Sequence, residues 1–311
     1  MAEVVGLGTL AMDVLVRVDR LPGPDGFAVV NERTFLPGGS GTNVIAQAAR
    51  LGAACAYVGK VGDDRLGQAI IESLQDEGVD TSGMRVLPGG ASLSTTVVVD
   101  AQGERFILLD MGDAFGSLRA DEVDTAAIAG ASVFYTDLLP SEPALAGVRA
   151  ARDAGVPVVF GLEVGMATMN GLGVSAEDVL DVASTADAFL PCREALADLA
   201  GSADLDAGLA FLERHCSGTA IVTLGRDGAV ALDGGTRTTV AGVAITPVDT
   251  TGAGDAFAGA FLYYRYVEQR DVAEAVRLGN AVAAASCTRQ GARGGPDRAG
   301  LEAFLTTTTK E

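Results

Sequence analysis

The 311-residue sequence is poor in basic and aromatic side chains. It has no tryptophan, one histidine (His215) and two lysines, Lys60 and Lys310. Its formal net charge is −19, with no run of basic residues, so nucleic acid and anionic membranes are not expected partners. It also lacks an apolar run of about 18 residues that could cross a membrane. Because its first residues do not resemble a signal peptide, we expect a cytoplasmic protein.

Cysteine and histidine show no metal-binding or disulfide pattern. The four cysteines are far apart and include no C-x-x-C: Cys55, Cys192, Cys216 and Cys287. We interpret them as small, mostly buried residues of a reducing compartment. His215 ends a helical pattern with no second metal-type ligand nearby, so no catalytic role is expected for it. The 48% hydrophobic content predicts a large buried core.

Short apolar runs alternate with helical patterns along most of the chain. Strands are predicted at Val4–Leu10, Ala54–Val58, Ala131–Tyr135, Val156–Gly161, Ala186–Leu190 and Ala220–Leu224. Helices are predicted between them, at Thr42–Leu51, Leu66–Glu77, Pro143–Ala154, Glu177–Ser184 and Leu205–His215. Apolar strands separated by helices indicate an α/β protein with a mostly parallel sheet covered on both faces. Ligands of such sheets bind beyond the carboxyl ends of the strands.

The segment Val248–Gly259, VDTTGAGDAFAG, carries the strongest chemical signal. Glycines and alanine at 252–254 precede a helical pattern, so free backbone N–H groups and the helix dipole converge there. An anion can approach this backbone closely because Gly252 and Gly254 lack a side chain. Asp255 would repel that anion, which suggests that it accepts a proton from an attacking hydroxyl. Alternatively, Asp255 is an ordinary acid in the first turn of a helix.

Two segments together resemble the signatures of the ribokinase-like (PfkB) family of carbohydrate and nucleoside kinases. The first runs through PGGSGTNV at 37–44, RLGA at 50–53 and VGKVGDDRLG at 58–67. The second is DTTGAGD at 249–255, followed by AFAGAF. The resemblance covers about Val4 to Pro296. It implies a three-layer, doubly wound, mostly parallel sheet with a small discontinuous β-sheet lid over the sugar site.

The resemblance also implies how the chain is divided. The kinase domain would comprise residues 1–13, 37–91 and 110–311, and the lid residues 14–36 and 92–109. The lid segments contain β-type runs without a helix between them, and the turn at Asp100–Gly103 predicts a hairpin. Lid strands often pair between subunits of this family, so a homodimer through the lid is expected.

Catalytic and sugar-binding roles follow from matching positions. In the resemblance, the backbone of Gly252, Ala253 and Gly254 holds the transferred phosphoryl group and Asp255 is the base. Sugar hydroxyls would be held by Asp13, Gly38, Gly39 and Asn43, with Asp137 as a looser match. Without the family, Asp13 and Asp137 could be turn acids and Asn43 a helix cap.

The nucleotide and a monovalent cation have matching positions as well. The segment TLGRDG at 223–228 resembles the turn beside ATP in this family. The implied nucleotide contacts are Thr223, Gly225, Gly228, Gly254 and Asn280, although a structural role for Asn280 is an alternative. A potassium loop would use Asp249, Thr251, Ser286, Arg289, Gly291 and Gly295, the last standing where serine is usual.

One departure concerns magnesium. The family normally has N-x-x-E after a strand, where the two side chains organise magnesium-bound waters. Here Cys192 and Ala195 occupy those two positions. Thiols are poor ligands for this hard cation. Glu194, one residue early, is the remaining candidate, and we expect an altered magnesium site.

The sequence therefore predicts an ATP- and magnesium-dependent kinase that phosphorylates a primary hydroxyl of a small sugar or polyol, and the resemblance implies that potassium aids it. A nucleoside kinase of the same family is the first alternative, with Phe27, Phe35 and Phe106 as stacking candidates. A sugar- or nucleotide-binding protein without activity is the second.

Overall fold

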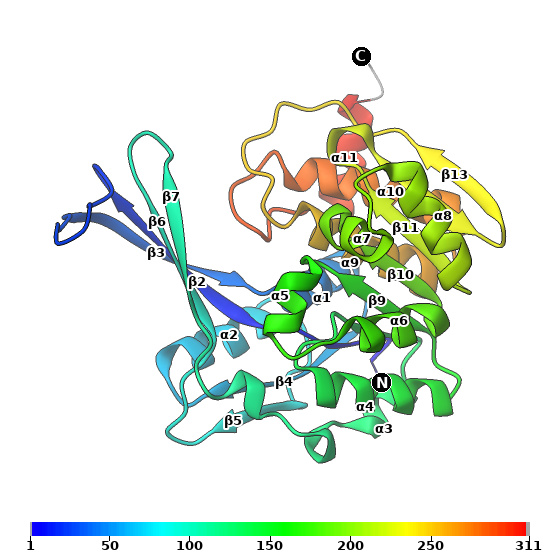
Figure 1. Ribbon diagram of the computed structural model, residues 1–311, viewed down its shortest axis with the longest axis horizontal. Coiled ribbons are helices and arrows are strands. Elements are labelled where there is room, and N and C mark those ends of the chain that lie inside the picture. Colours follow the sequence, from blue (N-terminus) through cyan, green and yellow to red (C-terminus); the bar gives the residue numbers. More distant parts are fainter. Residues whose placement is uncertain (1, 309–311) are drawn as a thin grey trace.

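A large sheet of nine strands forms the body of the molecule. The computed structural model describes residues 2–308 (Figure 1). The strand order of this sheet is β13-β12-β11-β10-β9-β8-β1-β4-β5, and only β12 and β13 run antiparallel to their neighbours. Its strands are β1 Val4–Leu7, β4 Cys55–Gly62, β5 Met84–Leu87, β8 Val133–Thr136, β9 Val158–Leu162, β10 Ala188–Pro191, β11 Thr219–Thr223, β12 Ala229–Asp233 and β13 Thr236–Val240.

Helices cover both faces of this sheet, which confirms the predicted three-layer α/β fold (Figure 1). The helix α4 packs on β8 and β9, whereas α1 packs on β1 and β4. The helices are α1 Ser40–Leu51, α2 Arg65–Gln75, α3 Thr125–Ala129, α4 Ser141–Asp153, α5 Met166–Gly171, α6 Ala176–Thr185, α7 Arg193–Ala200, α8 Leu205–His215, α9 Ala253–Leu262, α10 Val272–Ser286 and α11 Arg298–Thr308. None of these helices, all within residues 2–308, has the length and apolar character needed to cross a membrane.

A second sheet of four strands projects from the body (Figure 1). Its order is β3-β2-β6-β7, with bounds β3 Val30–Gly38, β2 Ala11–Val18, β6 Ser94–Val99 and β7 Arg105–Asp110. The predicted hairpin between β6 and β7 is confirmed, since Gly103 N–H donates to the Asp100 carbonyl. The small sheet extends beyond the predicted lid segments 14–36 and 92–109, since Asp13, which lies outside them, pairs with Leu36 on β3. Thus two of the predicted sugar ligands, Asp13 and Gly38, lie on the small sheet itself.

The sequence of the inner strands explains why they form the core. Every residue of β1, β8 and β9 is buried, as expected for parallel strands covered by helices on both faces. The strand β1 lies between β4 and β8, which follow it at very different points in the chain. The strand order therefore reverses beside β1, and the loops after β1, β8 and β9 open at one edge, where ligands bind in open sheets.

The helices α1 and α9 are in close contact behind this edge. A β-carbon on Gly259 would lie 2.4 Å from the carbonyl oxygen of Val44 and 2.7 Å from the Cβ of Gln47. Only glycine lets the two backbones approach this closely. The contact matters because α1 carries Asn43 and α9 carries Asp255.

We predict that Gly259→Ala destabilises the protein, although alanine favours helices. The added methyl group meets backbone, which cannot turn aside, and overpacking of this kind costs about 1–3 kcal/mol. The urea midpoint should fall while the m-value stays constant. Gly171→Ala is the matched control, because no atom lies within 4 Å of its β-carbon position. Equal stability of the two variants would contradict the tight contact between α1 and α9.

Candidate active site

Two pockets meet at the N-terminus of α9. One has a volume of about 400 Å³ and lies between the small sheet and the large one. The other, of about 590 Å³, lies between the turn after β11 and helix α10. Thr250, Ala253 and Gly254 line both pockets. Groups bound in the two pockets can therefore meet at this loop.

The loop before α9 has the geometry of an anion site. Gly252 is the N-cap of α9 with φ of 73°, and a β-carbon there would lie 2.2 Å from the Ala292 carbonyl oxygen. Glycine is therefore required for the left-handed turn and for its packing. At the start of α9 the unpaired N–H groups and the helix dipole favour a phosphate. These features agree with the sequence prediction for residues 252–254.

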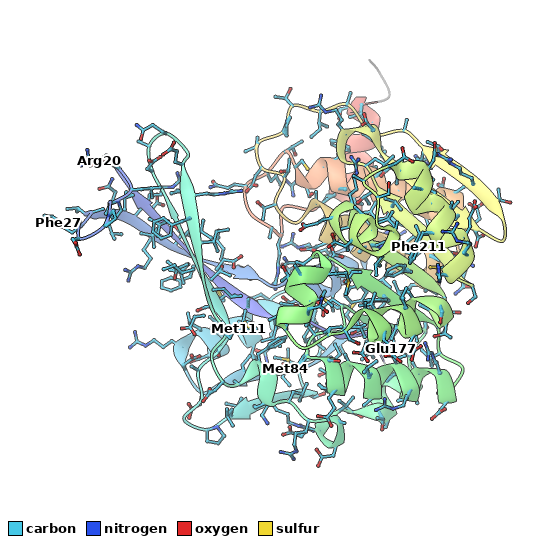
Figure 2. All side chains as sticks on the ribbon, viewed as in Figure 1. Arg20, Phe27, Met84, Met111, Glu177 and Phe211 are labelled. Atoms are coloured by element: carbon cyan, nitrogen blue, oxygen red, sulfur yellow. The ribbon has the colours of Figure 1, made fainter. Side chains whose placement is uncertain are left out.

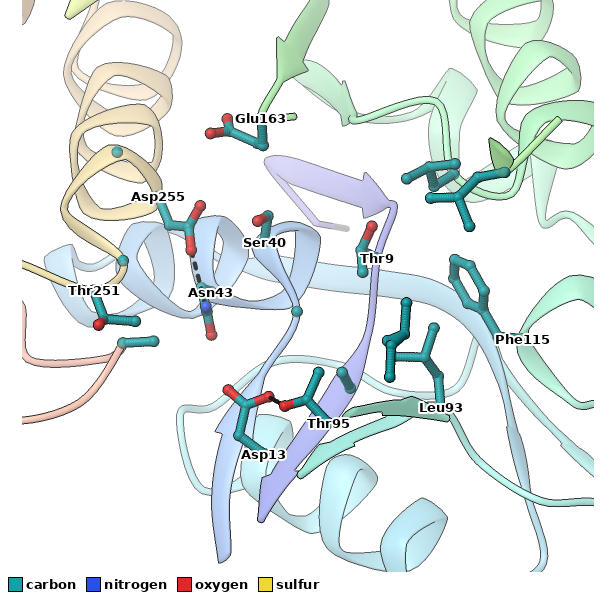
Figure 3. A pocket seen from close by; sticks show the side chains of 18 of the residues that line it. Thr9, Asp13, Ser40, Asn43, Leu93, Thr95, Phe115, Glu163, Thr251 and Asp255 are labelled. Atoms are coloured by element: carbon teal, nitrogen blue, oxygen red, sulfur yellow. Dashed lines mark hydrogen bonds between the residues drawn. The ribbon is translucent and has the colours of Figure 1, made fainter. Parts of the chain in front are cut away.

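Asp255 follows this loop and points into the first pocket (Figure 3). It is buried, and Asn43 Nδ2 donates a hydrogen bond of 2.9 Å to its Oδ2. Burial raises the pKa of Asp255 to about 6, although hydrogen bonds from Asn43 and Ser40 oppose the shift. At pH 7 and above the carboxylate is mainly ionised and can accept a proton, as a general base must.

Asn43 is fixed at both ends of its amide. Its Oδ1 accepts a hydrogen bond of 2.9 Å from Arg293 Nε, while its Nδ2 serves Asp255. Burial lowers the pKa of Arg293 to about 10, and its Nη2 has no hydrogen-bond partner within residues 2–308. Arg293 thus orients the asparagine that orients Asp255.

Asp13 enters the same pocket from the small sheet. Its carboxylate accepts a hydrogen bond from the Thr95 hydroxyl on the neighbouring strand (Figure 3). A β-carbon on Gly38 would lie 2.4 Å from Asp13 Oδ2, so Gly38 makes room for this carboxylate. Gly39, with φ of 86°, lines the pocket beside it. Burial is the main cause of the raised pKa of Asp13.

Asp137 does not line this pocket. Its carboxylate accepts hydrogen bonds from Thr9 N–H at 2.8 Å and from Leu139 N–H at 3.0 Å. It therefore ties the loop after β1 to the loop after β8. This geometry favours the turn role that the sequence had left open over the role of sugar ligand.

The second pocket gathers all the residues predicted to contact the nucleotide. They are Thr223, Gly225, Gly228, Gly254 and Asn280. Apolar side chains on α10 and on the segment after β13 line the rest of it, including Val243, Ile245 and Phe257. Asn280 Nδ2 also donates long hydrogen bonds, of 3.3 and 3.4 Å, to the carbonyls of Val240 and Ala241. Both interpretations of Asn280, as a lining residue and as a structural one, fit the structure.

The predicted potassium loop is closed by Asp249. Its carboxylate accepts hydrogen bonds from Thr251 N–H at 3.0 Å and Gly291 N–H at 2.9 Å. These bonds hold the pKa of Asp249 below its usual value although partial burial opposes them. At Gly295 the side chain of Gln47 fills the space that serine would need, since its Oε1 is 1.8 Å from the β-carbon position. Ser286 and Arg289 end the loop on the other side, where Arg289 N–H donates to the Ser286 carbonyl.

The turn after β10 does not bring Glu194 to either pocket. Cys192 caps α7 by accepting a hydrogen bond from Ala195 N–H through Sγ, and the helix begins at Arg193. Glu194 is therefore the second helical residue and is exposed to solvent. The sequence prediction that it serves magnesium is not favoured by this position.

The structure adds pocket residues that the sequence did not suggest. Glu163, which follows β9, turns its carboxylate toward the start of α9 (Figure 3). Thr95 and Phe115 also line the first pocket. The sequence did offer one signal for Glu163, because this carboxylate comes directly after a buried parallel strand. The phenylalanines considered for stacking on a base do not line the first pocket. Two of them, Phe27 and Phe35, are exposed to solvent.

Comparison with known proteins identifies the family. The model of the pfkB family carbohydrate kinases matches residues 1–298. The chain belongs to the pfkB family of carbohydrate kinases. It is 32% identical over 307 residues to the ATP-dependent ribose-1-phosphate kinase of Halopiger xanaduensis, covering 98% of both chains. It is 30% identical over 292 residues to fructokinase-1 of Zea mays, covering 88% of this chain and 90% of the relative.

Solved structures agree on the fold. A putative ribokinase II from E. coli, crystallised with ATP and Mg²⁺, superposes with a TM-score of 0.85 at 24% identity and covers 99% of this chain and 100% of its own. The family match makes this pfkB protein a sugar kinase, a phosphotransferase that acts on a sugar hydroxyl.

Asp255→Asn should reduce kcat by at least about 10²-fold while nucleotide affinity holds or improves, because the variant keeps the side-chain volume but cannot take a proton. In the unchanged protein, kcat/KM should fall as pH decreases through about 6, where Asp255 becomes protonated. Steady-state kinetics and calorimetry test both statements.

Thermal unfolding provides the control for this variant. The folded pKa of Asp255 is raised, so folding favours its protonated form and the ionised form adds no stability above pH 6. Asp255→Asn should therefore unfold no earlier than the unchanged protein at pH 7.5. A variant that retains more than about a tenth of kcat would reduce Asp255 to a helix-terminal acid.

Proposed function

We propose that the protein transfers the terminal phosphoryl group of ATP to a primary hydroxyl of a small, uncharged sugar or polyol. The observation that carries the proposal is the shared loop, since Thr250, Ala253 and Gly254 line both pockets. Sugar and nucleotide would each occupy one pocket and meet at the N-terminus of α9. A catalytically inactive binding protein would have no use for the ionisable Asp255 at this junction.

Each residue at the junction has one role in this mechanism. Asp13, Gly39 and Asn43 bind the sugar hydroxyls and bring one of them to Asp255. Asp255 accepts the proton of that hydroxyl as its oxygen attacks the phosphorus atom. The N–H groups at the start of α9 stabilise the charge on the transferred group. Magnesium, when bound with ATP, neutralises charge on the phosphates. The small sheet excludes water, which would otherwise compete with the sugar.

The charge of the first pocket favours an uncharged substrate. Its lining residues, all within the described part of the chain, include the acids Asp13, Glu163 and Asp255 but no lysine, arginine or histidine. A phosphorylated sugar would bring more negative charge into this acidic space. Arg105 on β7, whose charge helps to lower the pKa of Asp249, is a candidate to bind a second phosphate. Phe115 is the one aromatic residue of the lining, so a stacked nucleoside base is less well accommodated.

A phosphorylation assay over three substrate classes tests this proposal. We expect kcat/KM to be highest for neutral sugars such as ribose or fructose, lower for nucleosides and lowest for ribose 1-phosphate. Asp13→Asn should weaken binding of the preferred sugar by about 10-fold or more and leave ATP affinity unchanged, because its charge faces hydroxyls. A higher kcat/KM for ribose 1-phosphate than for the neutral sugars, lost in Arg105→Ala, would contradict the proposal of an uncharged substrate. Phosphorylation of none of these classes would contradict the kinase assignment.

The loop closed by Asp249 supports a potassium ion as a further requirement. The loop lies beside the anion loop, since the Ala292 carbonyl oxygen is 2.2 Å from the β-carbon position of Gly252, and a cation held there would support the positive field at α9. Gln47 Oε1 stands where serine is usual in the family and supplies an oxygen in its place.

An enzyme that uses ATP in this way fits the cytoplasm, where ATP is abundant.

The exposed apolar residues of the small sheet support a homodimer. Ile107 and Leu108 on successive positions of β7 are 57% and 59% exposed, and Phe27, at the far end of the sheet, is 90% exposed (Figure 2). Exposed apolar patches of this kind mark interaction sites. A second copy of the same sheet would cover them.

Sedimentation should therefore give the mass of a dimer for the unchanged protein and of a monomer for Ile107→Ser/Leu108→Ser. The serine changes remove apolar area that only the dimer buries. Val86→Ser on β5, where the valine is 49% exposed but outside the small sheet, is the control and should remain dimeric. A monomer in all three samples would exclude the lid interface.

A further inference from the structure

The turn after β10 offers no oxygen at the place where the family's asparagine and glutamate serve magnesium. Cys192 uses its sulfur to cap α7, and Ala195 is fully buried. Glu194 is exposed and lines neither pocket, and its Oε1 lies 2.6 Å from the β-carbon position of Gly165. Magnesium prefers oxygen ligands, so this turn alone does not fit the ion.

Glu163 occupies the equivalent place on the neighbouring strand. In the parallel pairing of β9 with β10, Leu162 lies opposite Pro191, so Glu163 and Cys192 each come directly after a paired residue. The two strand ends are linked, since Cys192 N–H donates to the Leu162 carbonyl at 2.7 Å. The Glu163 carboxylate also contributes to the raised pKa of the Cys192 thiol, after burial as the main cause. Glu163 thus brings a carboxylate next to the position of the missing asparagine.

The carboxylate of Glu163 is directed at the anion loop. Its Oε2 lies 3.6 Å from the β-carbon position of Gly254, one of the three residues shared by both pockets. Figure 3 shows the carboxylates of Glu163 and Asp255 turned toward the same space at the start of α9. Glu163 forms no hydrogen bond or ion pair with any other residue in the range 2–308. A carboxylate in this position lacks a cationic partner.

A buried hydroxyl beside Glu163 also lacks a partner. Tyr135 is fully buried, and its Oη has no hydrogen-bond partner among the described residues. This oxygen and Glu163 Oε1 lie 2.5 Å and 2.9 Å from one point, the β-carbon position of Gly161. Buried polar groups without a protein partner are rare in native proteins, so the Tyr135 hydroxyl is available to hydrogen-bond a water of a bound ion. The space around Glu163 is therefore suited to a hydrated cation.

We propose that Glu163 is the positioning residue that holds the magnesium ion of the bound nucleotide, in place of the family's asparagine and glutamate. Magnesium keeps several waters and needs only one or two carboxylates besides the nucleotide phosphates, so one glutamate beside the anion loop is sufficient. Burial together with Asp255 and Asp137 raises the pKa of Glu163, and a divalent cation would offset this repulsion. The inference rests on the proposed use of magnesium-bound ATP.

Calorimetry of ADP binding, in excess magnesium and in EDTA, tests Glu163 without requiring turnover. Glu163→Gln keeps the shape of the side chain, and Glu194→Gln is the matched control on the adjacent turn. We expect Glu163→Gln to reduce the affinity gained from magnesium by about 10–100-fold, as for other residues that position a metal. Its ADP affinity in EDTA should hold or increase, its sugar affinity should stay unchanged, and Glu194→Gln should match the unchanged protein.

A rescue variant distinguishes loss of the magnesium contact from an indirect structural effect of the substitution. Cys192→Asn, introduced into Glu163→Gln, returns an oxygen to the same edge and should restore part of the magnesium-dependent gain. Glu163→Asp, which keeps the charge on a shorter side chain, should give an intermediate loss and serves if Glu163→Gln unfolds early.

Two results for the variants would overturn the proposal. One is an unchanged magnesium gain in Glu163→Gln. The other is a loss of sugar affinity with the magnesium gain retained, which would make Glu163 a sugar ligand. If ADP binding by the unchanged protein ignored magnesium, the proposed function would fail as well, and that outcome is visible before any variant is made.

Discussion

The contact between α1 and α9 is the constraint on which the site depends. Gly259 allows the two helices to approach until a β-carbon would collide with the Val44 carbonyl. This approach places Asn43, on the sugar side, within 2.9 Å of Asp255, on the phosphate side. In the proposed mechanism, the base is therefore oriented by the same residue that binds the sugar. A shift of either helix would separate the two substrates' binding sites and disturb the proton acceptor together.

The site also concentrates negative charge, which opposes ionisation of its acids and favours a bound cation. Burial is the main cause of the raised pKa of Asp255, Glu163 and Asp137; the charge of Asp137 adds to the shift of Asp255, and the charges of Asp255 and Asp137 add to that of Glu163. The described residues near them include one cation, Arg293, whose contact with Asp255 passes through Asn43. Such a cluster remains incomplete until positive charge arrives with the nucleotide. The uncompensated acids thus favour binding of the metal-bound form of ATP over the free form.

The sequence predicted the parts of the fold and site that depend on local pattern. Buried apolar strands and the glycine turn before α9 lie where they were predicted, and the predicted nucleotide contacts share one pocket. Side-chain direction was not predictable, because it depends on strand pairing. Asp137 bonds to backbone at Thr9, and Glu194 turns outward on α7. Glu163 was missed because its importance comes from the register of β9 against β10, which spacing along one chain does not reveal.

A crystal structure with a neutral sugar and a non-hydrolysable ATP analogue tests the central claim most directly. The account predicts that the analogue's terminal phosphate lies at the N-terminus of α9, against the backbone of residues 252–254. One primary hydroxyl of the sugar should lie about 2.6–3.2 Å from an oxygen of Asp255 and face that phosphate. A sugar whose hydroxyls all point away from Asp255, or a nucleotide whose phosphates avoid the loop before α9, would contradict the account.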